Sequence, residues 1–279
     1  MKNKNIWDVL SIIILIILFL VFITPIFFVL LNSFKGRLYI SDNPFALPTG
    51  EMYAGFTNFV EGIQKTNFFQ AFGWSLFITV FSVAAIVLFT AMTAWYLVRV
   101  KNKFTSMLYF GFVFSMIVPF QMIMFTMSKL ADLLYLNNPV GMVVLYLGFG
   151  AGLSVFMLCG FMKAIPVEVE EASMIDGCTP LQTFFKVVFP MLKPTAITVA
   201  ILNAMWVWND YLLPYLVIGV STDYKTIPVA VQYLMGSYGA KDYGSLMALL
   251  VLAIIPIIVF YFSCQKYIIQ GVVAGAVKG

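Results

Sequence analysis

The chain has 279 residues, of which 62% are hydrophobic and 10% are charged, and its formal net charge is +4. Soluble domains carry about a quarter charged residues, so this composition indicates an integral membrane protein. The few basic residues form no stripe of the kind that nucleic-acid binding requires, and the absence of histidine removes the commonest general base and metal ligand.

Apolar runs long enough to cross a bilayer as a helix, which takes about 20 residues, predict the membrane spans. In chain order they are Val9–Phe34, Thr66–Val98, Phe104–Ser128, Leu133–Met162, Pro194–Thr222 and Tyr243–Gln265. The first run is too long for a signal peptide and lacks a small-residue cleavage site, so it is expected to stay in the protein. We therefore predict an all-α, polytopic membrane protein with six transmembrane helices.

Basic residues near the span ends orient the chain, because Lys and Arg are enriched in cytoplasmic loops. With the N-terminus inside, the inner side holds Lys2, Lys4, Arg99, Lys101, Lys103, Lys163, Lys186, Lys193, Lys266 and Lys278. The outer side then holds Lys35, Arg37, Lys65, Lys129, Lys225 and Lys241. This majority predicts that both termini are cytoplasmic, although Lys35 and Arg37, in a long outer loop, argue the other way. The segment 166–190 then faces the cytoplasm.

The segment 166–190 holds the one place where four acids crowd together: Glu168, Glu170, Glu171 and Asp176. Pro166 can occupy a first helical position, and acids in the first turns suit the helix dipole. Gly177 is suited to end this helix in a left-handed conformation. The sequence therefore predicts a short helix that ends at a glycine turn.

A second helix is predicted directly after the turn. Thr179 can act as its N-cap, Pro180 as its first residue, and Gln182 can close a capping box. Pro190 is expected to end this second, short piece. Local physics leaves two interpretations open: a contact surface for a soluble partner, with Ala172 and Ser173 allowing close approach, or an amphipathic segment lying on the membrane surface.

The run Glu171-Ala172-Ser173-x-x-Asp176-Gly177, followed thirteen residues after the glycine by Pro190, resembles the EAA motif of ATP-binding-cassette (ABC) importer permeases. More narrowly, the chain is similar to the second permease subunit of carbohydrate importers, the MalG-like type. The resemblance covers almost the whole chain. It includes Pro119-x-Gln121, Ile165-Pro166, Trp208-Asn209 with Pro214, and the tail Gly271-x-x-Ala274-Gly275-Ala276-Val277-Lys278-Gly279.

Three positions depart from the family pattern. Ser173 stands where a second alanine is usual, a change between small residues that keeps close packing. Trp74 stands where an asparagine commonly precedes Ser75. Cys159 stands where a basic residue is common at the end of the fourth span, and these last two departures put a polar role of their positions in doubt.

The resemblance implies the transmembrane domain of a type I ABC importer. Residues 1–65 would form an N-terminal transmembrane helix and an extracellular loop, 66–270 the permease core with its coupling loop 166–190, and 271–279 a cytoplasmic tail. The tail is either a contact for the ATPase or a frayed terminus. The chain would lie in the bacterial inner membrane with a MalF-like permease, two ATPase subunits and an extracellular sugar-binding protein.

The resemblance also implies that the coupling loop docks into a groove on the ATPase. The residues involved would be Glu171, Ala172, Ser173, Asp176 and Gly177, with Glu171 as the polar contact and Asp176 and Gly177 fixing the turn. ATP and Mg would bind to the partner ATPase, because this chain has no phosphate-binding GxxxxGK[ST] loop. No cofactor is expected on this chain, which would be a transport subunit and not an enzyme.

Polar and aromatic residues inside the spans are the candidates for a sugar path, because hydroxyls need hydrogen bonds and apolar ring faces stack on aromatics. Asp210 is the one acid in a predicted span, and an intramembrane acid is a functional-site hypothesis by default. The candidates are Asn209, Asp210, Asn203, Trp206 and Gln121. The alternative is that Asn209 and Asp210 form a structural hydrogen-bond cluster between helices.

Other functional classes have less support. A self-contained secondary transporter would need internal repeats or several ion-coupling acids in the membrane. An enzyme would have to work without histidine, without clustered carboxylates in the spans and without CxxC spacing among its three cysteines. An ABC permease for another solute and a membrane scaffold remain as alternatives.

Overall fold

The computed structural model describes residues 6–220, 222–235 and 242–276. The chain divides into two compact units. The first unit comprises Met1–Phe69 and Ala230–Ile258, and the second comprises Gln70–Val229 and Val259–Gly279. Of the predicted tail, residues 277–279 lie outside the described part of the chain.

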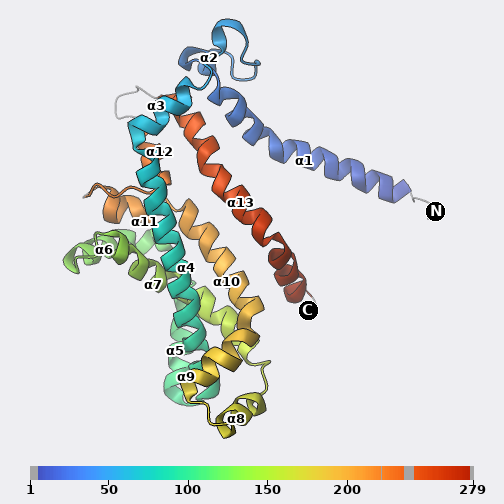
Figure 1. The fold of residues 1–279 in the computed structure, drawn as a ribbon, viewed down its shortest axis with the longest axis vertical. Helices are drawn as coiled ribbons and strands as arrows, with labels where there is room; N and C mark the ends of the chain where they lie inside the picture. Colours follow the sequence, from blue (N-terminus) through green and yellow to red (C-terminus); the bar gives the residue numbers. More distant parts are fainter. Residues whose placement is uncertain (1–5, 221, 236–241, 277–279) are drawn as a thin grey trace. The chain divides into compact units, whose positions relative to one another are not determined.

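Figure 1 shows a chain built from helices. The long helices are α1 (Ile6–Ser33), α4 (Phe68–Arg99), α5 (Lys103–Ser115), α6 (Phe120–Leu133), α7 (Pro139–Met162), α10 (Phe189–Asn209) and α13 (Tyr243–Ala276). The short ones are α2 (Arg37–Asp42), α3 (Thr57–Thr66), α8 (Val167–Ile175), α9 (Pro180–Thr183), α11 (Leu212–Pro214) and α12 (Ile227–Gln232). Two π-helical turns, η2 (Phe184–Val188) and η3 (Tyr215–Gly219), and two 3₁₀ turns, η1 (Gly50–Met52) and η4 (Tyr233–Met235), complete the described elements.

Five helical segments in the described part of the chain are long and apolar enough to cross a membrane, and α5 with α6 would make a sixth if the bent pair counts as one span. The five are Val9–Ser33, Phe68–Arg99, Pro139–Met162, Pro180–Asn209 and Tyr243–Tyr267. The prediction of an all-helical membrane protein is confirmed. The expectation of one continuous third span over Phe104–Ser128 is wrong, because α5 and α6 meet at a bend of 106°.

Pro119 accounts for the break in the third span. Its backbone is extended, with φ −61° and ψ 128°, and proline disfavours the helical conformation at the residue before it. Helix α5 therefore ends at Ser115, and Pro119 serves as the N-cap of α6. The fourth span also begins later than expected, at Pro139, because the side chain of Asn138 caps α7 by accepting a hydrogen bond from the Gly141 N–H at 2.9 Å.

The fifth span differs from the expected Pro194–Thr222 at both ends. Pro190 does not end a short helix as expected, because α9 continues through η2 into α10. In η2 the Phe189 N–H bonds to the carbonyl of Phe184, five residues back, and such π-turns let a helix absorb a local irregularity. At the other end Asp210 is extended, with ψ 122°, so α10 stops at Asn209.

The first unit is held by polar contacts to backbone carbonyls. The side chain of Lys35 is fully buried, and its Nζ donates to the carbonyl oxygens of Asn43 at 2.8 Å and Pro44 at 3.1 Å. Burial lowers the pKa of Lys35. Asn58 Nδ2 donates to the carbonyls of Ser33 and Lys35, both at 2.8 Å. Lys35 therefore has a structural role in the loop that follows α1.

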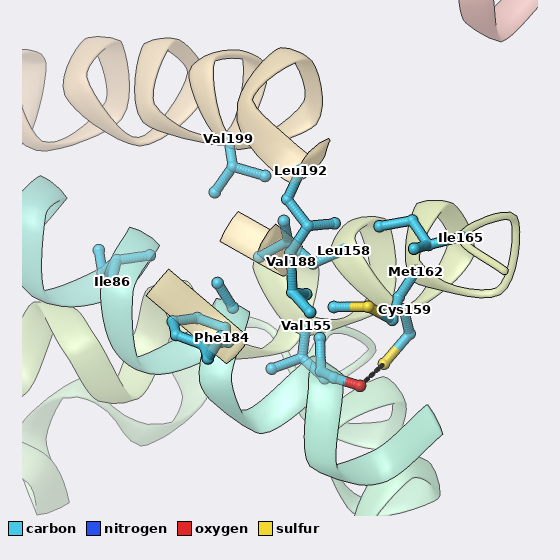
Figure 2. Packing of buried hydrophobic residues seen from close by; sticks show 12 residues of the cluster. Ile86, Val155, Leu158, Cys159, Met162, Ile165, Phe184, Val188, Leu192 and Val199 are labelled. Atoms are coloured by element: carbon cyan, nitrogen blue, oxygen red, sulfur yellow. Dashed lines mark hydrogen bonds between the residues drawn. The ribbon is translucent and has the colours of Figure 1, made fainter. Parts of the chain in front are cut away.

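The apolar core of the second unit joins α4, α7, η2 and α10 (Figure 2). Its labelled members are Ile86, Val155, Leu158, Cys159, Met162, Ile165, Phe184, Val188, Leu192 and Val199. Cys159 is buried there, and its Sγ approaches the Ala94 carbonyl oxygen at 3.9 Å. Phe184 and Val188 belong to η2, so the segment that follows the glycine turn contributes two buried side chains to the core.

Helix α7 packs closely on α5 through small residues, as expected in a membrane, where packing rather than hydrophobicity holds helices together. At Gly152 an added Cβ would lie 2.9 Å from the Phe112 carbonyl oxygen on α5 and 2.5 Å from Ser115 Oγ. At Gly148, one turn earlier on α7, nothing lies within 4 Å of such a Cβ.

Gly152→Ala is therefore expected to destabilise the protein by about 1–3 kcal/mol, because the α5 backbone must shift to admit the methyl group. Gly148→Ala is the matched control and should be neutral or stabilising by up to about 1 kcal/mol, since alanine favours a helix over glycine. Thermal unfolding in detergent measures both. Equal melting temperatures for the two variants would contradict the close α5–α7 contact.

Candidate functional site: the α8 loop and the end of α10

Helix α8 ends as its sequence predicts but begins one residue later. Pro166, expected at the first helical position, is the N-cap with an extended backbone, and Glu168 and Glu170 lie in the first turn. At its C-terminal end Gly177 has φ +88° and donates to the Met174 carbonyl at 3.0 Å. The Cys178 N–H donates to the Ser173 carbonyl, also at 3.0 Å. These two bonds form a Schellman motif, so the prediction of a left-handed glycine at this turn is confirmed.

The helix after the turn starts with the predicted capping box. The Gln182 N–H donates to Thr179 Oγ1 at 3.4 Å, and the Thr179 N–H donates to Gln182 Oε1 at 2.9 Å. Both orphan donors at this helix start are satisfied. Because α9 continues through η2 into α10, the turn connects α8 directly to a membrane span.

A buried carboxylate ties α8 to the end of α4. Glu170 is only 4% exposed. Its Oε1 accepts from Arg99 Nε at 2.8 Å and from Arg99 Nη2 at 2.6 Å, and its Oε2 accepts from Trp95 Nε1 at 2.8 Å. Arg99 Nη2 also donates to the Ile165 carbonyl at 2.9 Å. Removing one partner of such a pair typically costs ~3–5 kcal/mol, because a buried charge is left unpaired.

Ser173 makes a second tie, between α8 and α9. It is buried, its Oγ donates to the Glu170 carbonyl at 2.8 Å, and it lies 2.9 Å from Thr183 Oγ1. Ser173, predicted among the coupling residues, therefore faces the interior of the loop. Because Glu170 and Ser173 are three residues apart, they lie on one face of α8, the inward face.

The opposite face of α8 is exposed. Its four residues follow a spacing of three and four along the helix: Glu168, Glu171, Ala172 and Ile175. We call these four the outer face. Ile175 has 87% of its surface exposed, which is unusual for a large apolar side chain on a charged helix. The predicted coupling residues Glu171 and Ala172 thus lie together on this face, while Asp176 and Gly177 form the turn that follows it.

A cavity of about 1010 Å³ lies beside α8. Its lining comes from the end of α4, the start of α5, the end of α7 and the first turns of α8, and it includes Arg99, Lys163, Tyr109, Glu168 and Met174. Lys163 Nζ lies 5.7 Å from the centre of the Tyr109 ring. This space borders both α8 and the start of α5, whereas Glu170 and Ser173 give α8 its side-chain contacts to α4 and α9.

Asp210 lies at the break that follows α10. Its Oδ1 accepts a hydrogen bond at 3.0 Å from the N–H of Leu212, the first residue of α11. Its Oδ2 accepts a hydrogen bond from Tyr146 Oη, also at 3.0 Å. Tyr146 is fully buried on α7, and its ring meets that of Trp206 edge-on at 5.3 Å. Asp210 thus links the end of α10 to α7, as the alternative of a structural hydrogen-bond cluster expected, whereas the bond of Asn209, which that alternative also included, stays within α10.

The other predicted path residues are not gathered in one place. Asn203 is buried, and its Nδ2 donates to Ser154 Oγ on α7 at 3.1 Å and to the Val199 carbonyl at 2.9 Å. Asn209 is exposed at the end of α10, where its Nδ2 donates to the Met205 carbonyl at 2.7 Å. Trp206 is 37% exposed, and Gln121 is exposed near the start of α6.

Sequence reasoning did not single out Arg99, Trp95 or Tyr146. Arg99 counted only as a charge that orients the chain, and Tyr146 only as one of many aromatic residues. The spacing of three between Glu170 and Ser173 was a usable signal, since it places both on the face of α8 opposite Glu171. Nothing in the sequence pairs Glu170 with α4, because the partners are more than seventy residues apart.

Comparison with known proteins places the chain in context. A family model described as "Binding-protein-dependent transport system inner membrane component" matches residues 86–273. The chain is 39% identical over 263 residues to the "Probable starch degradation products transport system permease protein AmyC" of Thermoanaerobacterium thermosulfurigenes, covering 94% of each chain. It is 33% identical to the "Multiple sugar-binding transport system permease protein MsmG" of Streptococcus mutans, covering 91% of each.

A solved structure has the same fold. The match is to a chain in the "Crystal structure of a bacterial ABC transporter involved in the import of the acidic polysaccharide alginate". The TM-score is 0.72, and 96% of this chain and 98% of that chain are covered at 23% identity. At this identity the likeness concerns the fold.

Gly177→Ala is expected to destabilise the turn after α8 by about 1–2 kcal/mol, because a Cβ is disfavoured in the left-handed region. Gly177→Asn should be milder, since asparagine tolerates that region. Hydrogen exchange at the Cys178 amide, which bonds to the Ser173 carbonyl, measures the opening of the turn after correction for the intrinsic rate of each variant. Faster exchange in the alanine variant than in the asparagine variant supports the Schellman motif, and identical rates contradict it.

Proposed function

The chain belongs to the family of binding-protein-dependent transport system inner membrane components, and on that premise we propose that it is one permease subunit of an ATP-driven importer of sugars, oligosaccharides in particular. Support for the sugar comes from the names of its relatives, which carry starch degradation products, multiple sugars or arabinooligosaccharides. The observation on which the coupling role depends is the exposed outer face of α8. The inward face of the same helix is held by the hydrogen bonds of Glu170 and Ser173.

The partner that fits the outer face of α8 is a cytoplasmic ATPase. Three features favour a protein groove over the membrane surface as the site that receives this face. Glu168 and Glu171 would be repelled by anionic lipid headgroups, Ala172 allows close approach, and Ile175 offers an apolar anchor of the kind that protein interfaces bury. In this proposal Glu171 makes the polar contact and Ile175 the apolar one.

The division of labour follows from what the chain carries. In the sequence there is no GxxxxGK[ST] loop to hold the phosphates of ATP. We therefore assign ATP and Mg²⁺ to the partner ATPase, and to this chain the conversion of ATPase closure into a change of the membrane path. A second permease, two ATPases and an extracellular sugar-binding protein complete the proposed complex, with both termini of this chain in the cytoplasm.

Within the chain, the end of α10 is the proposed stretch of the sugar path. Asn209 is exposed there, next to Trp206, and both offer groups that suit a sugar: an amide for hydroxyls and an indole for an apolar ring face. Asp210 and Asn203 support this stretch through Tyr146 and Ser154. Gln121 on α6 is a separate candidate.

A charge reversal on the outer face tests the docking proposal. Glu171→Lys combined with Ile175→Asp is expected to lower the amount of ATPase that co-purifies by about tenfold or more, the change for a loss of ~1.4 kcal/mol of binding. Asp223→Lys is the matched control, because it reverses an exposed acid on the side proposed to be extracellular. Full ATPase recovery with the double variant would contradict the docking face.

The class of solute is tested with the complete complex in proteoliposomes. ATP hydrolysis is measured with the solute-binding protein and either maltotriose, raffinose or arabinotriose, against glutamine and a dipeptide as non-sugar controls. The proposal expects that at least one sugar stimulates hydrolysis and that the controls do not. Stimulation by a control solute and by none of the sugars would contradict the proposal and indicate an importer of another class of solute.

A further inference from the structure

We propose that Glu170, Arg99 and Trp95 form a latch that makes α8 and the C-terminal end of α4 move as one piece when the ATPase acts on α8. This inference rests on the function proposed above and adds positioning residues to it. We use the term latch for these three residues only. None of them lies on the outer face of α8.

Three hydrogen bonds to the carboxylate of Glu170 hold the latch together. One carboxylate oxygen of Glu170 accepts two donors of Arg99, at 2.8 and 2.6 Å, and the other accepts Trp95 Nε1 at 2.8 Å. Trp95 and Arg99 are four residues apart, so they project from the same face of α4. Charge-assisted bonds of this kind are shorter and stronger than neutral ones, and they fix orientation as well as distance.

Burial makes the latch resist separation. The side chains of Arg99 and Glu170 are 18% and 5% exposed. Pulling α8 away from α4 would leave a largely buried charge without its partner, which costs more than separating a fully exposed pair. A force on α8 therefore displaces the end of α4 before it breaks the pair.

On its inward face α8 can pass that force to α4 through the latch and to α9 through Ser173. The cavity of about 1010 Å³ borders α8 and the start of α5. Residues 163–166 form a short linker between α7 and α8, and Arg99 Nη2 also donates to the Ile165 carbonyl of that linker, at 2.9 Å. Arg99 thus joins α4, the linker and α8. Without it, α8 would keep the bond of Glu170 to Trp95 and the contact of Ser173 with Thr183, but the charged tie to α4 and the hold on the linker would be lost.

The motion received by α4 can travel through the second unit. Trp95 packs on Phe184 of η2, with ring centres 5.5 Å apart, and Phe184 lies in the core shared by α4, α7 and α10. The contact of Ser173 with Thr183 carries the same displacement into α9. The latch therefore connects the proposed docking face, through this core, with α10, whose far end forms the proposed path.

A reporter of the path tests the latch without any sugar. In a chain whose partly exposed Cys178 and Cys264 are replaced by alanine, Asn209→Cys is labelled with a membrane-impermeant maleimide. The rate is measured in the complete complex without nucleotide and after trapping with ADP and vanadate. For the intact latch we expect trapping to change the rate by about fivefold or more, within the usual range of coupling between distant sites.

Arg99→Gln and Glu170→Gln should remove this change, so that the rates with and without trapping agree within about twofold, well below the usual range of coupling, while vanadate still inhibits the ATPase. Trp95→Phe should retain part of the change, since it removes one hydrogen bond and keeps the ring on Phe184. Lys101→Gln is the matched control: it neutralises an exposed base two residues from Arg99, and the change should persist.

The outcomes separate the latch from the function on which it rests. If the rate still responds to trapping in Arg99→Gln and Glu170→Gln, or does not respond with the intact latch, the latch is overturned, and a lower melting temperature alone would assign the pair to stability. If no ATPase co-purifies with the unaltered chain, the proposed function fails instead. Should both glutamine variants fail to assemble, an unchanged response in Trp95→Phe would also overturn the latch.

Discussion

The buried pair of Glu170 and Arg99 is the contact on which the organisation of the α8 loop depends. A carboxylate that is 4% exposed is tolerated because Arg99 and Trp95 satisfy both of its oxygens. With Glu170 turned inward, the helical repeat directs Glu171 and Ile175 outward. One internal ion pair therefore decides which face of α8 a partner can meet.

The remainder of the second unit gives this loop a firm base. The Schellman motif at Gly177 and the capping box at Thr179 close the two helix ends of the turn. The π-turn η2 then carries the chain into α10 without a break, and its residues Phe184 and Val188 lie in the apolar core. A short polar loop is thus continuous with a membrane span, as the proposed coupling role requires.

The sequence predicted the elements whose causes are local. Composition indicated the spans, Gly177 and Thr179 indicated the turn after α8, and the EAA-like run indicated the family.

Prediction from the sequence failed where a distant contact or a neighbouring turn determines the local structure. Pro190 was expected to end a helix, but the π-turn η2 just before it lets the helix continue into α10. Lys35 counted against the predicted orientation, although its side chain is buried against the carbonyls of Asn43 and Pro44. The partners of Glu170 and Asp210 depend on tertiary packing, which no spacing along the chain encodes.

The outer face of α8 is the surface proposed to meet an ATPase, and a photo-crosslinking amino acid at position 175 reports what this surface touches. Ile175 is 87% exposed, so the replacement should leave the fold of the chain unchanged. In membranes that contain the whole complex, irradiation is expected to yield an adduct with the combined mass of this chain and the ATPase. Adducts with lipid alone would contradict the account and place α8 on the membrane surface.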